Sequence, residues 1–159
     1  MFTFININLW LHILSAITWI GSIFFTWWVL TPGIKASCSP EEAVFRIVSL
    51  ERRFRKIAHP VIALITITGV LNLMSSSAIE KFKTSPQFEY LVACKIILLG
   101  LMIFAHIVRH NIYARKILST AENRKTTGAG LEVWKKSENV LVLQAVMGVI
   151  LVFLGINLR

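Results

Sequence analysis

The chain has 159 residues and a net charge of +9, and 55% of its residues are hydrophobic while only 16% are charged. A water-soluble domain of this length covers itself with charged side chains, so the composition excludes an ordinary globular protein. Most of the positive charge lies in two segments between apolar blocks, a distribution that does not indicate a nucleic-acid-binding protein.

Four apolar blocks are each long enough to cross the hydrocarbon core of a bilayer, which takes about 20 residues of helix. We therefore predict an all-α integral membrane protein, a single four-helix bundle that forms one domain over residues 1–159. In chain order, the expected helices cover about residues 9–30, 40–75, 86–118 and 140–158.

Local signals predict where these helices begin and end. Thr31-Pro32-Gly33 is expected to end the first helix. Ser39-Pro40-Glu41-Glu42 is typical of a capping box in which Glu42 reaches back to Ser39, and the second helix should project well into the cytoplasm before it enters the membrane. Ser85-Pro86 should start the third helix in the same way, and Gly128 and Gly130 should break the chain before the fourth.

The basic residues predict the orientation in the membrane. They gather between the first and second helices and between the third and fourth, whereas the remaining loop, 75–89, holds only Lys81 and Lys83, balanced by Glu80 and Glu89. By the positive-inside rule, the two basic loops are cytoplasmic and both termini lie outside. The chain is thus expected to be a multi-pass protein of the inner (plasma) membrane whose basic loops also attract anionic membrane lipid.

All four histidines and one lysine lie at membrane depth, where ionisable side chains are costly and usually functional. Counting about 1.5 Å per residue places His59 and His106 at one level near the inner face, and His12 and Lys95 at one level in the outer leaflet. His110 shares a helix face with His106, four residues earlier. The five tryptophans are expected mostly at the membrane interfaces, not around a cofactor.

Two imidazoles that face each other across a bundle can bind a haem iron from both sides. We therefore predict haem b bound by His59 and His106, with His110 as the alternative ligand one turn along and with His12 and Lys95 as a second candidate site, for one haem or two in all. The alternative interpretation is an interfacial histidine without a ligand, or a lysine that extends its ammonium to the surface.

Several short motifs carry a resemblance to known proteins. Trp10-Leu11-His12 followed by Trp19-Ile20-Gly21 resembles the first helix of a group of small bacterial membrane proteins. That group contains the CopD-like copper-resistance domain and the haem-containing protoporphyrinogen oxidase of the HemJ type. Glu51-Arg52-Arg53, His59-Pro60 and Thr68-Gly69 resemble the second helix of both families, and Lys95 followed by His106 resembles the third helix of the oxidase.

The resemblance implies that His12, Lys95 and His106 are candidates for haem binding or catalysis. The chain departs from the oxidase family at Thr31-Pro32-Gly33, where that family usually carries Pro-Arg. It therefore lacks, at this point, a basic partner for the propionates of a porphyrin.

From these observations we predict a haem b-binding membrane cytochrome that transfers electrons, received from a quinone pool or from a partner redox subunit. The first alternative is a HemJ-like oxidoreductase acting on a porphyrin, the second a CopD-like copper transporter, and the third a non-catalytic subunit of a larger complex or a homo-oligomer. Copper is disfavoured because the four methionines are scattered and form no Met-x-x-Met motif.

Overall fold

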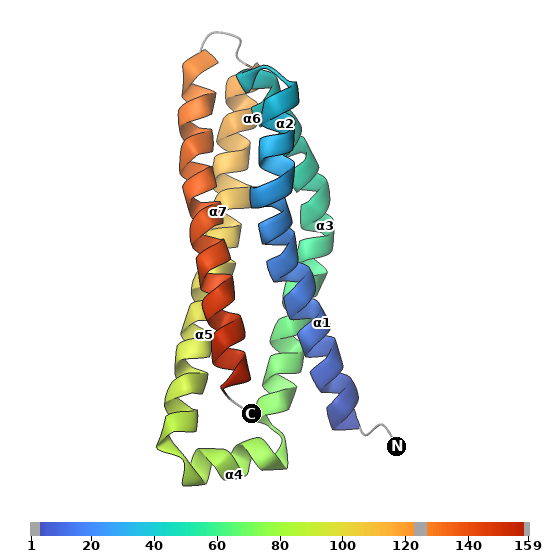
Figure 1. The fold of residues 1–159 in the computed structure, drawn as a ribbon, viewed down its shortest axis with the longest axis vertical. Coiled ribbons are helices and arrows are strands. Elements are labelled where there is room, and N and C mark those ends of the chain that lie inside the picture. The colour runs from blue at the N-terminus through green and yellow to red at the C-terminus, as the bar shows by residue number, and fades with distance from the viewer. Residues whose placement is uncertain (1–3, 123–126, 158–159) are drawn as a thin grey trace.

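The computed structural model describes residues 4–122 and 127–157, and every element in these ranges is a helix. Four helical segments are long and apolar enough to cross a membrane, namely Asn6–Ser37, Glu42–Leu73, Pro86–Ile117 and Glu132–Ile156. They run side by side as one long bundle (Figure 1). The prediction of an all-helical protein with four helices long and apolar enough to cross a membrane is therefore confirmed for the described residues.

The first segment is longer than predicted. It consists of α1 (Phe4–Phe25), a π-helical turn η1 (Thr26–Leu30) and α2 (Thr31–Ser37). The prediction that Thr31-Pro32-Gly33 ends this helix is wrong. The Thr31 N–H bonds to the carbonyl of Thr26, five residues earlier, and such a widened turn lets the helix continue past Pro32, whose missing N–H and bulky ring disrupt a regular α-helical ladder.

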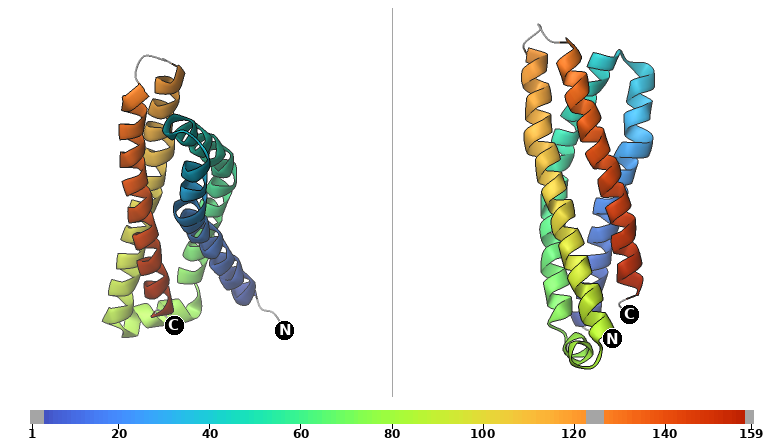
Figure 2. Two further views of the ribbon diagram at one scale, coloured as in Figure 1. Left: turned by 45° about the horizontal axis from the view of Figure 1, so that its top comes forward. Right: turned by 90° about the vertical axis from the view of Figure 1, so that its left-hand side faces the viewer.

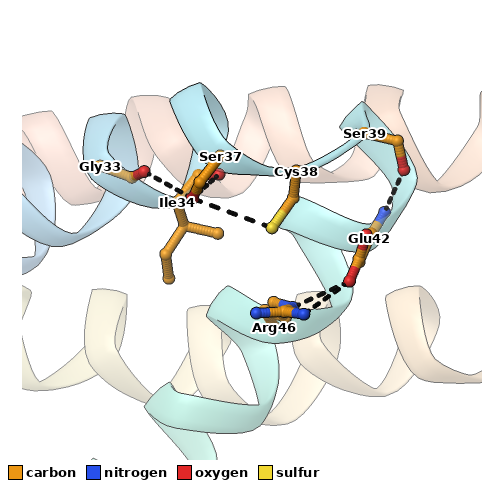
Figure 3. A network of polar contacts seen from close by, with 7 residues as sticks. All are labelled: Gly33, Ile34, Ser37, Cys38, Ser39, Glu42 and Arg46. Atoms are coloured by element: carbon orange, nitrogen blue, oxygen red, sulfur yellow. Dashed lines mark hydrogen bonds and ion pairs between the residues drawn. The ribbon is translucent and has the colours of Figure 1, made fainter.

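The second segment begins as predicted. Ser39 is the N-cap of α3 (Pro40–Leu73), and its hydroxyl accepts a hydrogen bond from the Glu42 N–H at 3.4 Å. The prediction that the Glu42 side chain reaches back to Ser39 is wrong. The Glu42 carboxylate instead accepts two hydrogen bonds from Arg46 (Figure 3). The helix continues through Pro60 to Leu73, close to the predicted end.

The loop between the second and third segments contains a short helix that the sequence analysis did not predict. This helix, α4 (Ser76–Thr84), lies across one end of the bundle (Figure 1). Ser75 caps it by accepting a hydrogen bond from the Ala78 N–H at 3.4 Å. Phe82 packs edge-on against Phe88 at the start of the next helix, with ring centroids 5.0 Å apart. We call this end the α4 end, and the first and last described residues also lie there.

The third segment again contains a π-helical turn. It comprises α5 (Pro86–Ile107), η2 (Val108–Tyr113) and α6 (Ala114–Glu122), and Ser85 caps α5 as predicted. The fourth segment is one helix, α7 (Thr127–Ile156), which passes through Gly128 and Gly130. The prediction that these glycines interrupt the helical structure is wrong. They lie in the same helix as the segment that packs against the neighbouring helices, and this packing outweighs their low helix propensity.

Around the bundle, α1 packs against α3 and α7, and α7 packs against α5 (Figure 2). The α3 helix meets the third segment through η2 and α6, at the end opposite α4, which we call the basic end. Two apolar cores follow this arrangement. The larger lies along the membrane-crossing part and includes Trp19, Ile65, Met102 and Leu141. The smaller lies at the basic end and is made of Val44, Ile47, Val48, Ile117 and Trp134.

The tryptophans divide between the surface and these cores. Trp10 and Trp28 are exposed, as interface residues should be. Trp19 and Trp134 are each only 2% exposed, so the interface prediction is wrong for these two. Trp19 thereby becomes available to the site described below.

A buried ion pair joins α3 to the third segment. A guanidinium nitrogen of Arg109, in η2, donates to the carboxylate of Glu51, and the two residues are 4% and 5% exposed. Arg109 lies inside the predicted third helix, at 86–118, but its pairing with Glu51 was not predicted. Because each charge is shielded from water by the bundle, each depends on the other for compensation.

We expect Glu51→Gln to lower the free energy of unfolding by about 3–5 kcal/mol, because it leaves Arg109 buried without an opposite charge. Glu42→Gln removes the exposed partner of Arg46 and should have a much smaller effect, because water screens an exposed ion pair. Thermal unfolding of both variants in detergent checks this, and equal losses would contradict the role assigned to burial.

Candidate functional site

Three of the four histidines meet in the half of the bundle nearer the basic end. His59 comes from α3, His106 from the last turn of α5 and His110 from η2. The ring centroids of His59 and His106 are 5.7 Å apart, and those of His106 and His110 are 4.3 Å apart. The structure therefore places the two histidines of the predicted inner pair side by side, with His110 directly adjacent.

The three rings differ in their surroundings. His106 is 5% exposed and His110 is also buried, whereas His59 is exposed on one side. The indole of Trp19 meets His106 edge-on, with centroids 6.2 Å apart. The Nε2 atom of His106 is buried and has no hydrogen-bond partner among the described residues. A buried ring nitrogen without a partner is costly, and binding a metal is one role that compensates for this cost.

We tested whether this arrangement fits a haem. Two imidazoles that bind one metal ion from opposite sides hold their centroids about 6 Å apart, because each metal–nitrogen bond is about 2 Å long. The separation of 5.7 Å between His59 and His106 agrees with this, whereas the 4.3 Å between His106 and His110 is too short. The buried Nε2 atom of His106 has no described hydrogen-bond partner and could bind a metal, so the two histidines fit the group by their chemistry and spacing.

The described residues contain no group of three or more His, Cys, Asp or Glu side chains arranged to hold a metal ion. A metal centre here would therefore use only two protein ligands. A haem held by two histidines would take its other four ligands from the porphyrin, so His59 and His106 would suffice to hold it.

His12 lies toward the α4 end, on the face of α1 that packs against α3. Its Nδ1 is 3.1 Å from the carbonyl oxygen of Ile65 and 3.0 Å from the hydroxyl of Thr68. A carbonyl only accepts, and the Thr68 hydroxyl already donates to Leu64, so Nδ1 must carry the proton. The Nε2 atom of His12 is then left as an acceptor. Metal-binding histidines commonly show this arrangement, with one nitrogen tied to a carbonyl and the other free to bind.

Gly69 makes room for the His12 ring. A Cβ atom at this position would lie 3.2 Å from His12 Cε1, closer than most side-chain contacts. Thr68 and Gly69 therefore both position His12. The Thr68 hydroxyl contacts the Nδ1 atom of His12, and the missing side chain of Gly69 leaves space for the His12 ring.

Lys95, on α5, is the other member of the predicted outer pair. It is near enough to His12 for the two side chains to interact electrostatically. Its Nζ lies close to α7, 3.4 Å from the position of a Cβ at Gly155. Among the described residues no acidic group or hydrogen-bond acceptor pairs with Lys95, so its charge is available for a ligand.

Two polar features of the site were missed by the sequence analysis. Near His12, the Asn8 amide donates to the carbonyl of Thr68 at 3.0 Å and to the side chain of Asn72 at 2.7 Å. Near His110, Arg55 donates to the side chain of Asn111 at 3.4 Å. The sequence does contain an indication of the polar contacts near His12. Asn8 and His12 are four residues apart, as are Thr68 and Asn72, so each pair lies on one helix face.

Comparisons of the chain with protein-family models, with curated proteins and with solved structures find no match. The likeness to CopD-like and HemJ-type proteins therefore rests on the short motifs alone. The function is therefore inferred from the geometry of the two sites.

Proposed function

We propose that the protein binds haem b within the plasma membrane and transfers electrons there, and that His59 and His106 would hold the iron. The observation that carries this proposal is the pair of rings 5.7 Å apart, one of which has a buried Nε2 atom without a partner. When bound, the haem supplies one-electron exchange at an iron whose potential is set by its ligands and surroundings.

The surrounding side chains have distinct roles in this proposal. Trp19 and His110 pack against His106 on two sides and limit the rotation of its ring. Arg55 lies within electrostatic range of both His106 and His110. A fixed positive charge there disfavours the more positive, oxidised iron and should raise the reduction potential.

A second candidate function, a HemJ-like protoporphyrinogen oxidase, is favoured by the outer pair. The acceptor nitrogen of His12 and the unpaired charge of Lys95 lie near each other in the half of the bundle toward the α4 end. A lysine ammonium binds a carboxylate such as a porphyrin propionate, or a quinone oxygen, and a neutral lysine amine can ligate iron. The same pair therefore serves a second haem, a porphyrin or a quinone.

The orientation proposed here places the basic end in the cytoplasm and α4 with both termini outside. The supporting observation is the separation of charge, because the basic residues of α3, α6 and α7 lie toward the end opposite α4.

Reporter fusions test this orientation. A fusion after Arg159 and one within Ser76–Thr84 should report the outside, and a fusion within residues 123–126 should report the cytoplasm. A cytoplasmic reporter signal from the C-terminal fusion would contradict the orientation.

For the inner pair, we expect the purified, reduced protein to show a low-spin b-type absorption spectrum and a pyridine haemochrome of haem b. His59→Ala and His106→Ala should each convert the iron to high spin or lose it, because each removes an axial ligand. His110→Ala is the matched control and should keep the low-spin spectrum. Gel filtration checks that each variant is folded. Unchanged spectra in both His59→Ala and His106→Ala would contradict the assignment.

For the outer pair, we expect Lys95→Ala and His12→Ala to behave alike, because both groups act on one ligand. Haem content and porphyrinogen oxidation are measured side by side. Loss of a second haem in both variants indicates a two-haem electron carrier, and retained haem with loss of porphyrin formation indicates the oxidase. An effect of His12→Ala alone would show that Lys95 has no part in the site.

A further inference from the structure

A cavity of about 210 Å³ lies at the basic end of the bundle, between α3 and the third segment. Arg52 and Arg55 of α3 line it from one side, and His110, Ala114 and Arg115 line it from the other. Three of the five lining residues are thus arginines, and no acidic residue is part of the lining.

The charges around this cavity are not neutralised within the described residues. The neighbouring acid on α3, Glu51, is buried in its pair with Arg109. Arg55 donates to Asn111, which is neutral. No described acidic side chain pairs with Arg52, Arg55 or Arg115. Like charges that converge without a counter-charge repel one another, and an anion in the cavity relieves this repulsion.

The cavity sits where the bundle changes from polar to apolar. On α3 the run Arg52-Arg53-Phe54-Arg55-Lys56 ends at Ile57, from which the helix is apolar. At this level Ile57 of α3 is 54% exposed and Ile112 of η2 is 47% exposed, outside the cavity lining. A water-soluble anion gains nothing from this apolar surface. A phospholipid uses both parts, because its phosphate lies at the headgroup level and its acyl chains extend along the apolar surface.

We propose that this cavity binds the phosphate of an anionic phospholipid. Arg52, Arg55 and Arg115 bind the phosphate oxygens, since a guanidinium presents paired N–H donors that match them. The acyl chains extend from there along the exposed apolar surface of the helices. A bound lipid bridges α3 and α6 at the point where the second and third segments meet. This site does not depend on whether a haem is bound.

The test titrates the full chain in neutral detergent with phosphatidylglycerol and follows unfolding by tryptophan fluorescence. We expect phosphatidylglycerol to raise the melting temperature in a saturable way, and phosphatidylcholine, whose choline cancels the phosphate charge, to have little effect. The double variant Arg55→Gln/Arg115→Gln should raise the lipid concentration for half-saturation about tenfold or more.

The matched control is Arg53→Gln/Lys56→Gln, which removes the same charge at the same level outside the cavity lining. It should leave the lipid response unchanged. An equal loss in both double variants would assign the effect to surface charge and overturn the site, as would an equal response to phosphatidylcholine. Saturation by glycerol 3-phosphate alone would assign the cavity to a soluble phosphate and also overturn the proposal. If the first double variant does not fold, Arg115→Gln alone must weaken the lipid response.

Discussion

The buried ion pair between Glu51 and Arg109 is the contact on which the arrangement of the inner histidines depends. The α3 helix packs against the third segment through η2 and α6, and this pair lies within that contact. Two charges shielded from water cannot be separated without a large cost, so they hold α3 and η2 in one relative position. His106 lies three residues before Arg109, and His59 lies eight residues after Glu51. Holding the charges together therefore also holds these two rings across from each other.

The π-helical turn η2 makes this combination possible. Arg109 and His110 are consecutive residues, yet both are buried, one pairing with Glu51 and the other packing on His106. A widened turn changes the direction of the side chains that follow it, and such turns occur often at functional sites. The same turn also borders the cavity lined by Arg52, Arg55 and Arg115, because His110 is part of its lining. One local irregularity thus contributes a structural charge, a ring of the histidine cluster and a wall of the cavity.

Depth along a helix could be predicted from the sequence, but rotation about its axis could not. The rise per residue is constant, so counting placed His59 beside His106 and His12 near Lys95. Counting does not tell which way a side chain points, so the pairing of Arg109 with Glu51 across two helices was not predicted. The wrong helix ends share another cause. Pro32, Gly128 and Gly130 disfavour helices by local propensity, and here a π turn or the packing of a long helix overrides that preference.

The two candidate sites meet different chemical requirements, and one helix connects them. At His12 the tautomer is set by the Ile65 carbonyl, and the partner is a lysine; at His106 the Nε2 atom lacks a partner, and the neighbour is a second histidine. The outer pair is therefore suited to an anionic or carbonyl-bearing ligand, and the inner pair to an iron that changes its charge. Trp19, seven residues after His12 and so on the same face of α1, contacts His106 edge-on. Trp19 thus links the helix that carries His12 to the inner pair. Both proposed functions share the inner pair, so the ligand of the outer pair distinguishes them.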